Sequence, residues 1–166
     1  MAKDNRLAMI LLTGGIAVLA LLFAGFILIW HTQTYTVPDV ELQYIDGSRG
    51  HLNDYRGRPV LVTFWATTCR LCIREIPDLI ALHEELGPKG LQISAIAMPY
   101  DHPAQVARYS QQRGLPYKVA LDVEARAVRA FDHVRVTPTN FLLAPDGHIV
   151  MKETRSVKGP AGWRHE

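Results

Sequence analysis

A run of 24 residues without an ionisable side chain, residues 7–30, divides this 166-residue chain into two unlike parts. As a helix that rises ~1.5 Å per residue, the run is long enough to cross a hydrocarbon core of ~30 Å with some tilt. A cleaved signal peptide and a buried core helix are the alternatives. The apolar part of a signal peptide covers only ~7–15 residues and ends in a small-x-small site, whereas Leu22-Phe23-Ala24 places a bulky residue there. We therefore expect a retained transmembrane anchor over residues 7–30.

The charges beside this run indicate its orientation. Residues 1–6 contain two basic side chains, whereas residues 31–48 contain no Lys or Arg. By the positive-inside bias, residues 1–6 stay in the cytoplasm and the rest of the chain is exported. We expect a short linker over residues 31–37 and one globular domain over residues 38–166.

The composition excludes several classes of protein. Apolar residues make up 48% of the chain and charged residues 20%, which is typical of a globular protein and not of a disordered one. The formal net charge is only +2, and no Lys/Arg-rich run occurs. Nucleic acid is therefore not an expected partner.

Hydrophobic periodicity predicts the elements of the exported part. Alternating or continuous apolar runs indicate strands at residues 37–44, 59–65, 91–98 and 117–121, and a terminal hairpin built from residues 141–143 and 148–151. Helical spacing indicates helices at residues 69–86, 102–112 and 123–131. Asp101 is placed to cap the second of these helices, with Pro103 in its first turn. Alternating strands and helices followed by a hairpin imply an α/β fold with a mixed central sheet.

The two cysteines of the chain, Cys69 and Cys72, stand at the junction of the strand at 59–65 and the helix that follows it. A structural disulfide is one interpretation, but a bridge around two intervening residues constrains the unfolded chain very little. A metal site is another, but two thiolates fall short of the four ligands that a structural zinc takes. No histidine lies within ten residues of the pair. The third interpretation is thiol–disulfide exchange.

Exchange chemistry gives this spacing a direct use. A cysteine at a helix amino terminus meets unpaired backbone N–H groups and the positive end of the helix dipole, which stabilise its thiolate. Cys69 is expected at such a place, and Arg70 adds positive potential. Cys72 follows about one turn later, close enough to resolve a mixed disulfide formed at Cys69. We therefore favour a redox pair over a staple or a metal site.

The stretch FWATTCRLCIREIP, residues 64–77, resembles the FWATWCxxCxxExP signature of membrane-anchored TlpA/ResA proteins, within the AhpC-TSA/Redoxin-like thioredoxin superfamily. Further matches to the family pattern are DYRGRPVLV at residues 54–62 and VTPTNFL at residues 136–142. The resemblance covers nearly the whole exported part. It implies a thioredoxin-like fold, with a mixed central sheet flanked by helices and a terminal β-hairpin, and it makes Cys69–Cys72 a redox-active disulfide.

The resemblance also implies the surroundings of this disulfide. The bond between Thr137 and Pro138 would be cis and packed against the two sulfurs. The groove between Pro138, Trp65 and Leu71 would receive an extended segment of a client protein through backbone hydrogen bonds.

Glu75 is the acid that the resemblance assigns to proton transfer. Thioredoxins proper place a buried carboxylate six residues before the first cysteine, and that position holds Thr63 in this chain. The TlpA/ResA branch has a glutamate three residues after the second cysteine, where Glu75 stands. One turn beyond Cys72, it is placed to accept that thiol's proton directly or through water. The alternative is a solvated helix glutamate.

The sequence departs from the family pattern at three places. Thr68 replaces the usual aromatic residue before the first cysteine, which opens that side of the site. The pair Arg70-Leu71 is not typical of a known oxidant or reductant, so the redox potential stays open. Residues 159–166 end where the family continues into a final helix, and a truncated helix would leave apolar sheet surface bare.

The function that the resemblance implies is that of a protein-disulfide reductase of the bacterial inner membrane, with its catalytic domain in the periplasm. Its partners would be exported protein thiols and disulfides, such as those of apocytochrome c or of copper-centre assembly proteins, and a membrane electron donor; no cofactor or metal is implied. A disulfide oxidase of the same fold is one alternative. A peroxiredoxin-like peroxidase is another, although Val62 and Ala66 break its PxxxTxxC motif. A copper-binding metallochaperone is the third, with His133 as a distant ligand, although the cysteine spacing is one residue short.

Overall fold

A computed structural model describes residues 14–16, 18–26 and 36–154 of the chain. The chain forms two compact units, residues 1–35 and residues 36–166. The boundary falls inside the predicted linker, so the second unit corresponds to the predicted globular domain.

The first unit contains part of the predicted anchor. Residues 14–16 and 18–26 are helical, and their large apolar side chains are exposed. Across the part of the chain that the structure describes, no helix is both long and apolar enough to span a bilayer. The rest of the predicted anchor, residues 7–13, 17 and 27–30, lies outside the described residues. The predicted truncated terminal helix also lies outside them.

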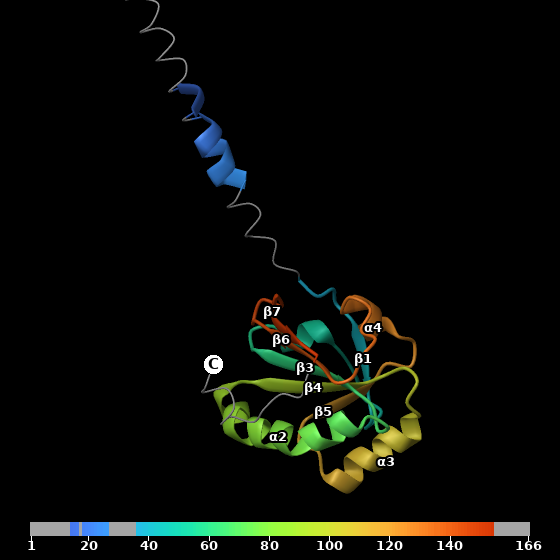
Figure 1. Ribbon diagram of the computed structural model, residues 1–166. Coiled ribbons are helices and arrows are strands. Elements are labelled where there is room, and N and C mark those ends of the chain that lie inside the picture. The colour runs from blue at the N-terminus through green and yellow to red at the C-terminus, as the bar shows by residue number, and fades with distance from the viewer. Residues whose placement is uncertain (1–13, 17, 27–35, 155–166) are drawn as a thin grey trace, which may run out of the picture. The chain divides into compact units, whose positions relative to one another are not determined.

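The second unit is built on a seven-stranded mixed sheet with the strand order β2-β1-β5-β4-β3-β6-β7 (Figure 1). Its strands are β1 (Glu41–Tyr44), β2 (Arg49–His51), β3 (Val60–Trp65), β4 (Gln92–Ala97), β5 (Lys118–Leu121), β6 (Thr139–Leu143) and β7 (Ile149–Glu153). Its helices are α2 (Arg70–Leu86), α3 (Pro103–Arg113) and α4 (Arg126–Ala130), with 3-10 turns η1 (Leu52–Tyr55) and η2 (Gly87–Lys89). The central strands β3, β4 and β5 are parallel, and the pairings toward both edges are antiparallel. The predicted α/β fold with a mixed sheet is confirmed.

Strand β3 is the element that positions the cysteines. All six of its residues are buried, because β4 and β6 pair with its two edges and helices cover both faces of the sheet (Figure 1). Such a strand has a nearly continuous apolar sequence, which is why β3 could be predicted. Its carboxyl end at Trp65 leads through residues 66–69 directly into α2.

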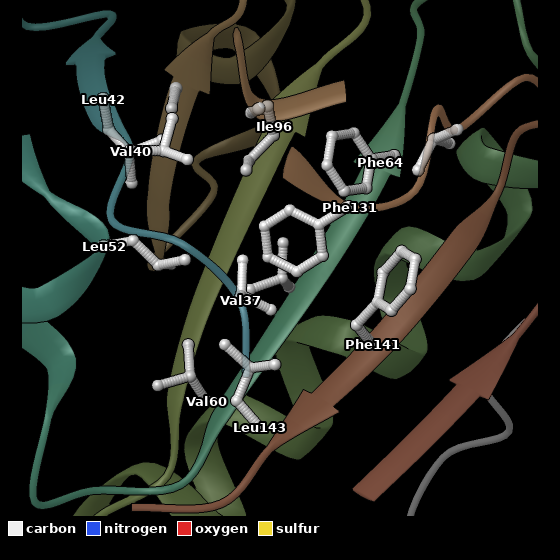
Figure 2. Close-up of a cluster of buried hydrophobic side chains, with 14 of the residues drawn as sticks. Val37, Val40, Leu42, Leu52, Val60, Phe64, Ile96, Phe131, Phe141 and Leu143 are labelled. Atoms are coloured by element: carbon white, nitrogen blue, oxygen red, sulfur yellow. The ribbon is translucent and has the colours of Figure 1, made fainter. Parts of the chain in front are cut away.

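Alternate side chains of β3 point into two hydrophobic cores. Phe64 faces the core that includes α4 and η1, whereas Trp65 faces the core beneath α2 and α3. In the first core, Phe64, Phe131 and Phe141 pack against one another with ring centroids 4.9–6.0 Å apart (Figure 2). The sheet is therefore held from both sides, and the end of β3 is a rigid base for the loop that follows.

Two details differ from the sequence prediction. Helix α4 is shorter than the predicted 123–131, because Ala125 adopts a left-handed backbone conformation (φ 56°) immediately before it. Helix α3 lies close to its predicted position, but the prediction that Asp101 caps it is wrong. His102 is the N-cap residue, without a side-chain capping hydrogen bond, and Asp101 instead accepts hydrogen bonds from Thr67.

Candidate redox site

Cys69 occupies the N-cap position of α2. Its backbone is extended (φ −85°, ψ 104°), and its Sγ accepts a hydrogen bond from the Cys72 N–H at 3.1 Å. The unpaired N–H groups at a helix amino terminus and the helix dipole favour a negative charge there. A thiolate at Cys69 is therefore stabilised by a backbone donor and by the helix as a whole.

The two cysteines form a disulfide with 5.3 Å between their Cα atoms. They differ in accessibility, since Cys69 is partly exposed and Cys72 is only 2% exposed. A sulfur of another protein can therefore approach Cys69, whereas Cys72 is covered. This geometry suits an outer cysteine that attacks and an inner cysteine that resolves.

The residues beside Cys69 are open to solvent. Thr68 and Arg70 are exposed, and Leu71 is 46% exposed although it is apolar. Val136, immediately before Thr137, is 60% exposed. Leu71 stands in the first turn of α2 and is one of the residues that the family resemblance assigns to the client groove, and that role stays a prediction.

The Thr137–Pro138 peptide bond is cis, as the resemblance implies. Pro138 is buried and directly precedes β6. Because Thr139 of β6 lies opposite Phe64 of β3, Pro138 lies beside the carboxyl end of β3, where the chain leaves toward Cys69. The structure thus brings the proline loop and the cysteine loop together at the carboxyl end of β3.

Glu75 lies inside the protein. Its side chain is 1% exposed, and its Oε1 accepts a hydrogen bond from Asn140 Nδ2 at 2.9 Å. The alternative of a solvated helix glutamate is therefore wrong. Cys72 and Glu75 both belong to the buried face of α2, one turn apart. A buried carboxyl group beside a redox cysteine is suited to proton transfer.

A small cavity joins Cys72 to Glu75. Its volume is about 10 Å³, and its lining includes Thr63, Trp65 and Tyr117; this is close to the smallest volume that holds one water molecule. Thr63 Oγ1 and Trp65 Nε1 are buried and make no hydrogen bond within the described part of the chain. The size and polar lining of the cavity suit a water that bridges the thiol and the carboxyl group. Burial raises the pKa of Tyr117, and the Glu75 carboxylate raises it further, so this phenol stays protonated.

Trp65 supports the site from within. It is 4% exposed, and its ring centroid lies 6.0 Å from that of Tyr109 on α3. Because so little of the side chain is exposed, its described contacts are those of a buried residue that supports the site. The place of Trp65 in the client groove stays a prediction.

Sequence reasoning missed two polar contacts of the site. Asn140 lies within the buried strand β6, and a polar side chain there needs a buried partner, which was the available signal. Asp101 contacts Thr67 across a separation of 34 residues, which no local pattern reveals.

His133, the histidine considered for copper, is exposed. In the residues that the structure describes, no three His, Cys, Asp or Glu side chains are grouped so as to hold a metal ion.

Comparison with known proteins places this site in a family context. The profile of the AhpC/TSA family matches residues 34–152. The thiol-disulfide oxidoreductase ResA of Geobacillus thermodenitrificans is 30% identical over 114 residues, which cover 69% of this chain and 64% of that protein. The chain thus spans less than two thirds of the length of this curated relative.

Solved structures agree with this match. A thiol:disulfide interchange protein from a Bacteroides species is 25% identical with a TM-score of 0.65, over 74% of this chain and 82% of that chain. A thioredoxin family thiol:disulfide interchange protein from Chlorobium tepidum TLS, 22% identical, has a TM-score of 0.70 over 76% of this chain and 90% of that chain. The two structures confirm the thioredoxin-like fold, and the family model and the ResA relative confirm the resemblance to TlpA/ResA proteins. The matched residues make up most of this chain and include both cysteines, and the chain therefore belongs to the AhpC/TSA family.

Proposed function

We propose that this protein is a thiol–disulfide oxidoreductase that uses Cys69 and Cys72 as its redox couple. The observation that carries the proposal is the difference between the two sulfurs. Cys69 is partly exposed at the amino terminus of α2, whereas Cys72 is covered and lies within one turn of it. The name of the ResA relative supports the same chemistry.

The reaction takes place in two exchange steps. In the first, the Cys69 thiolate attacks one sulfur of a client disulfide; a mixed disulfide forms, the client S–S bond breaks, and the second client sulfur leaves as a thiolate that takes a proton. In the second, Cys72 gives its proton to Glu75 and attacks the Cys69 sulfur. The mixed disulfide breaks, the Cys69–Cys72 disulfide forms, and the client leaves with both of its sulfurs reduced.

Net transfer is two electrons and two protons from the protein to the client. The oxidised protein then needs an external dithiol to restore Cys69 and Cys72. We propose that a membrane electron donor supplies it, that the anchor is residues 7–30, and that the second unit lies in the periplasm of a bacterium. The proposed clients are exported proteins such as apocytochrome c or copper-centre assembly proteins.

Reduction of insulin by the purified protein tests the activity. The wild-type protein with a dithiol donor should accelerate insulin reduction, and Cys69→Ser should abolish the acceleration. Equal rates with and without the wild-type protein would overturn the proposal. The reduction potential of the couple then decides the direction, because a value near ~−270 mV fits a reductant and a value near ~−120 mV fits an oxidant.

A further inference from the structure

A buried carboxylate outside the cysteine helix holds the loop that carries Cys69. Asp101 lies in the connection between β4 and α3 and is 8% exposed. Its Oδ2 accepts the Thr67 N–H at 2.5 Å, and its Oδ1 accepts the Thr67 hydroxyl at 2.7 Å. Gln105 of α3 donates from Nε2 to the same Thr67 oxygen at 2.8 Å. Both polar groups with which Thr67 can donate are therefore bound to one carboxylate.

Thr67 is the second residue of the turn that presents Cys69. The Cys69 N–H donates to the Ala66 carbonyl oxygen at 3.0 Å, which closes a four-residue turn between β3 and α2. This turn sets where Cys69 stands relative to the first N–H groups of α2. Hydrogen bonds to a charged acceptor are stronger than those between neutral groups, so two of them on one residue restrict the turn strongly.

We propose that Asp101 is a positioning residue of the redox site, and that it acts on the Cys69 thiolate through Thr67. The contacts of Asp101 have no part in capping α3, which begins at Pro103 after His102. The carboxylate instead joins the carboxyl ends of β3 and β4, which are parallel neighbours. This inference rests on the proposed redox function, because its consequence is the stability of the thiolate.

Loosening the turn between β3 and α2 should destabilise the Cys69 thiolate. The Cys69 sulfur accepts a hydrogen bond from the Cys72 N–H at 3.1 Å, and a sulfur that departs from this position loses that donor and the helix dipole. Thr67→Val removes the hydroxyl without removing the charge of Asp101, so it tests position alone. We expect alkylation of reduced Cys69 at neutral pH to slow ~2–5-fold, the effect of part or all of one hydrogen bond of ~1 kcal/mol. The equilibrium with glutathione should shift toward the Cys69–Cys72 disulfide by a similar factor.

Two further variants separate positioning from a general loss of structure. Thr67→Ser keeps the hydroxyl and should restore the wild-type alkylation rate. In an Asp101→Ala background, which removes both acceptors of Thr67, Thr67→Val should slow Cys69 no further, because the two residues act as one unit.

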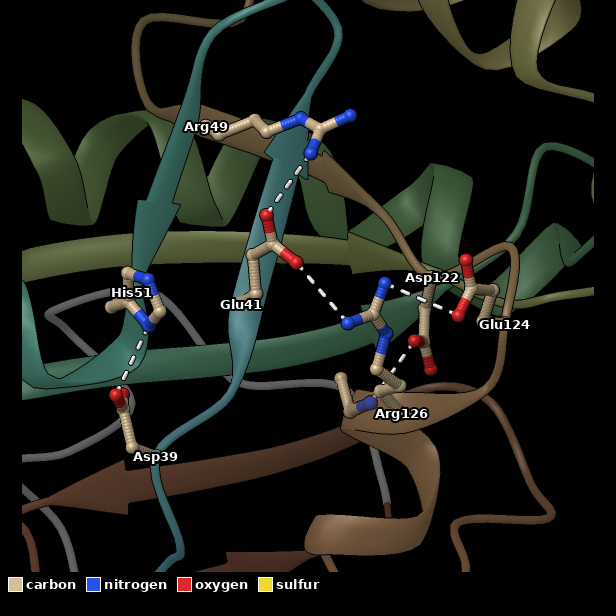
Figure 3. Close-up of polar contacts among 8 residues, drawn as sticks. Asp39, Glu41, Arg49, His51, Asp122, Glu124 and Arg126 are labelled. Atoms are coloured by element: carbon tan, nitrogen blue, oxygen red, sulfur yellow. Dashed lines mark hydrogen bonds and ion pairs between the residues drawn. The ribbon is translucent and has the colours of Figure 1, made fainter.

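Asp122 provides a matched control. It is 7% exposed and, like Asp101, accepts two hydrogen bonds, from the Ala127 N–H at 3.0 Å and the Val128 N–H at 2.8 Å. Both bonds go to the start of α4 and not to Thr67, and Figure 3 shows Asp122 near Arg126, the first residue of that helix. Asp122→Asn should lower stability and leave both redox readouts unchanged.

The outcomes distinguish this inference from the proposed function. A wild-type protein that fails to reduce insulin would overturn the function. A wild-type protein that reduces insulin, together with Thr67→Val at the wild-type alkylation rate, would overturn the positioning role alone. Thr67→Ser as slow as Thr67→Val, or Asp122→Asn as slow as either, would also overturn it.

Discussion

Glu75→Gln is expected to slow the resolution of the mixed disulfide without slowing its formation. Cys72 is 2% exposed and Glu75 1% exposed, so bulk water has little access to either group. Cys72 must lose its proton before it attacks, and loss of a positioned base costs ~10²–10⁴-fold in rate. This factor corresponds to ~3–5 kcal/mol of activation free energy. Glutamine keeps the volume of the side chain and an oxygen that can accept from Asn140, so the fold should be retained.

Rapid mixing with a disulfide peptide, followed by acid quench and mass spectrometry, separates the two steps. The mixed disulfide at Cys69 should form at the wild-type rate in Glu75→Gln and then persist. Glu84→Gln is the control, because Glu84 is exposed on the same helix and should leave both rates unchanged. Resolution at the wild-type rate in Glu75→Gln would refute the role of Glu75 as the base.

Two other predictions concern stability and pH. Phe131→Ala removes a fully buried ring whose centroid lies 5.2 Å and 4.9 Å from two neighbouring phenylalanine rings. Urea denaturation should show a free energy of unfolding lower by ~3–5 kcal/mol. A change below ~1 kcal/mol would contradict the packing described. Hydrogen bonds from Ser48 are the main cause, and the contact with Lys118 is the smaller one, of the lowering of the pKa of Asp46 from 3.8 to about 2. Since the pKa is lower in the folded state than in the unfolded state, the stabilisation by Asp46 is complete above the unfolded pKa and is lost as the pH falls through the folded pKa. An NMR titration of the Asp46 carboxyl group checks this, and a midpoint at the ordinary value would disprove it.

The sequence predicted the elements whose signals are local. The apolar run before the cysteines predicted β3, and the helical spacing after them predicted α2 with Cys69 at its start. In both cases the signal is the spacing of apolar residues a few positions apart along the chain.

The two missed polar contacts share one physical cause, which is a partner distant in sequence. Asp101 precedes a helix and has the chemistry of a cap, but its carboxylate accepts two hydrogen bonds from Thr67 instead of capping the helix. Glu75 Oε1 accepts a hydrogen bond from Asn140, which lies 65 residues away. A helical pattern can place Glu75 on a face of α2, but it cannot show that β6 supplies a hydrogen-bond donor to it.

In the proposed reaction Cys69 attacks the client disulfide and Cys72 resolves the mixed disulfide. Trapping of the mixed disulfide tests it most directly: each single Cys→Ser variant is reduced, mixed with a disulfide peptide and analysed by mass spectrometry. We expect a lasting adduct on Cys69 in Cys72→Ser and little or no adduct in Cys69→Ser. Equal adducts in the two variants, or an adduct that forms faster on Cys72, would contradict it.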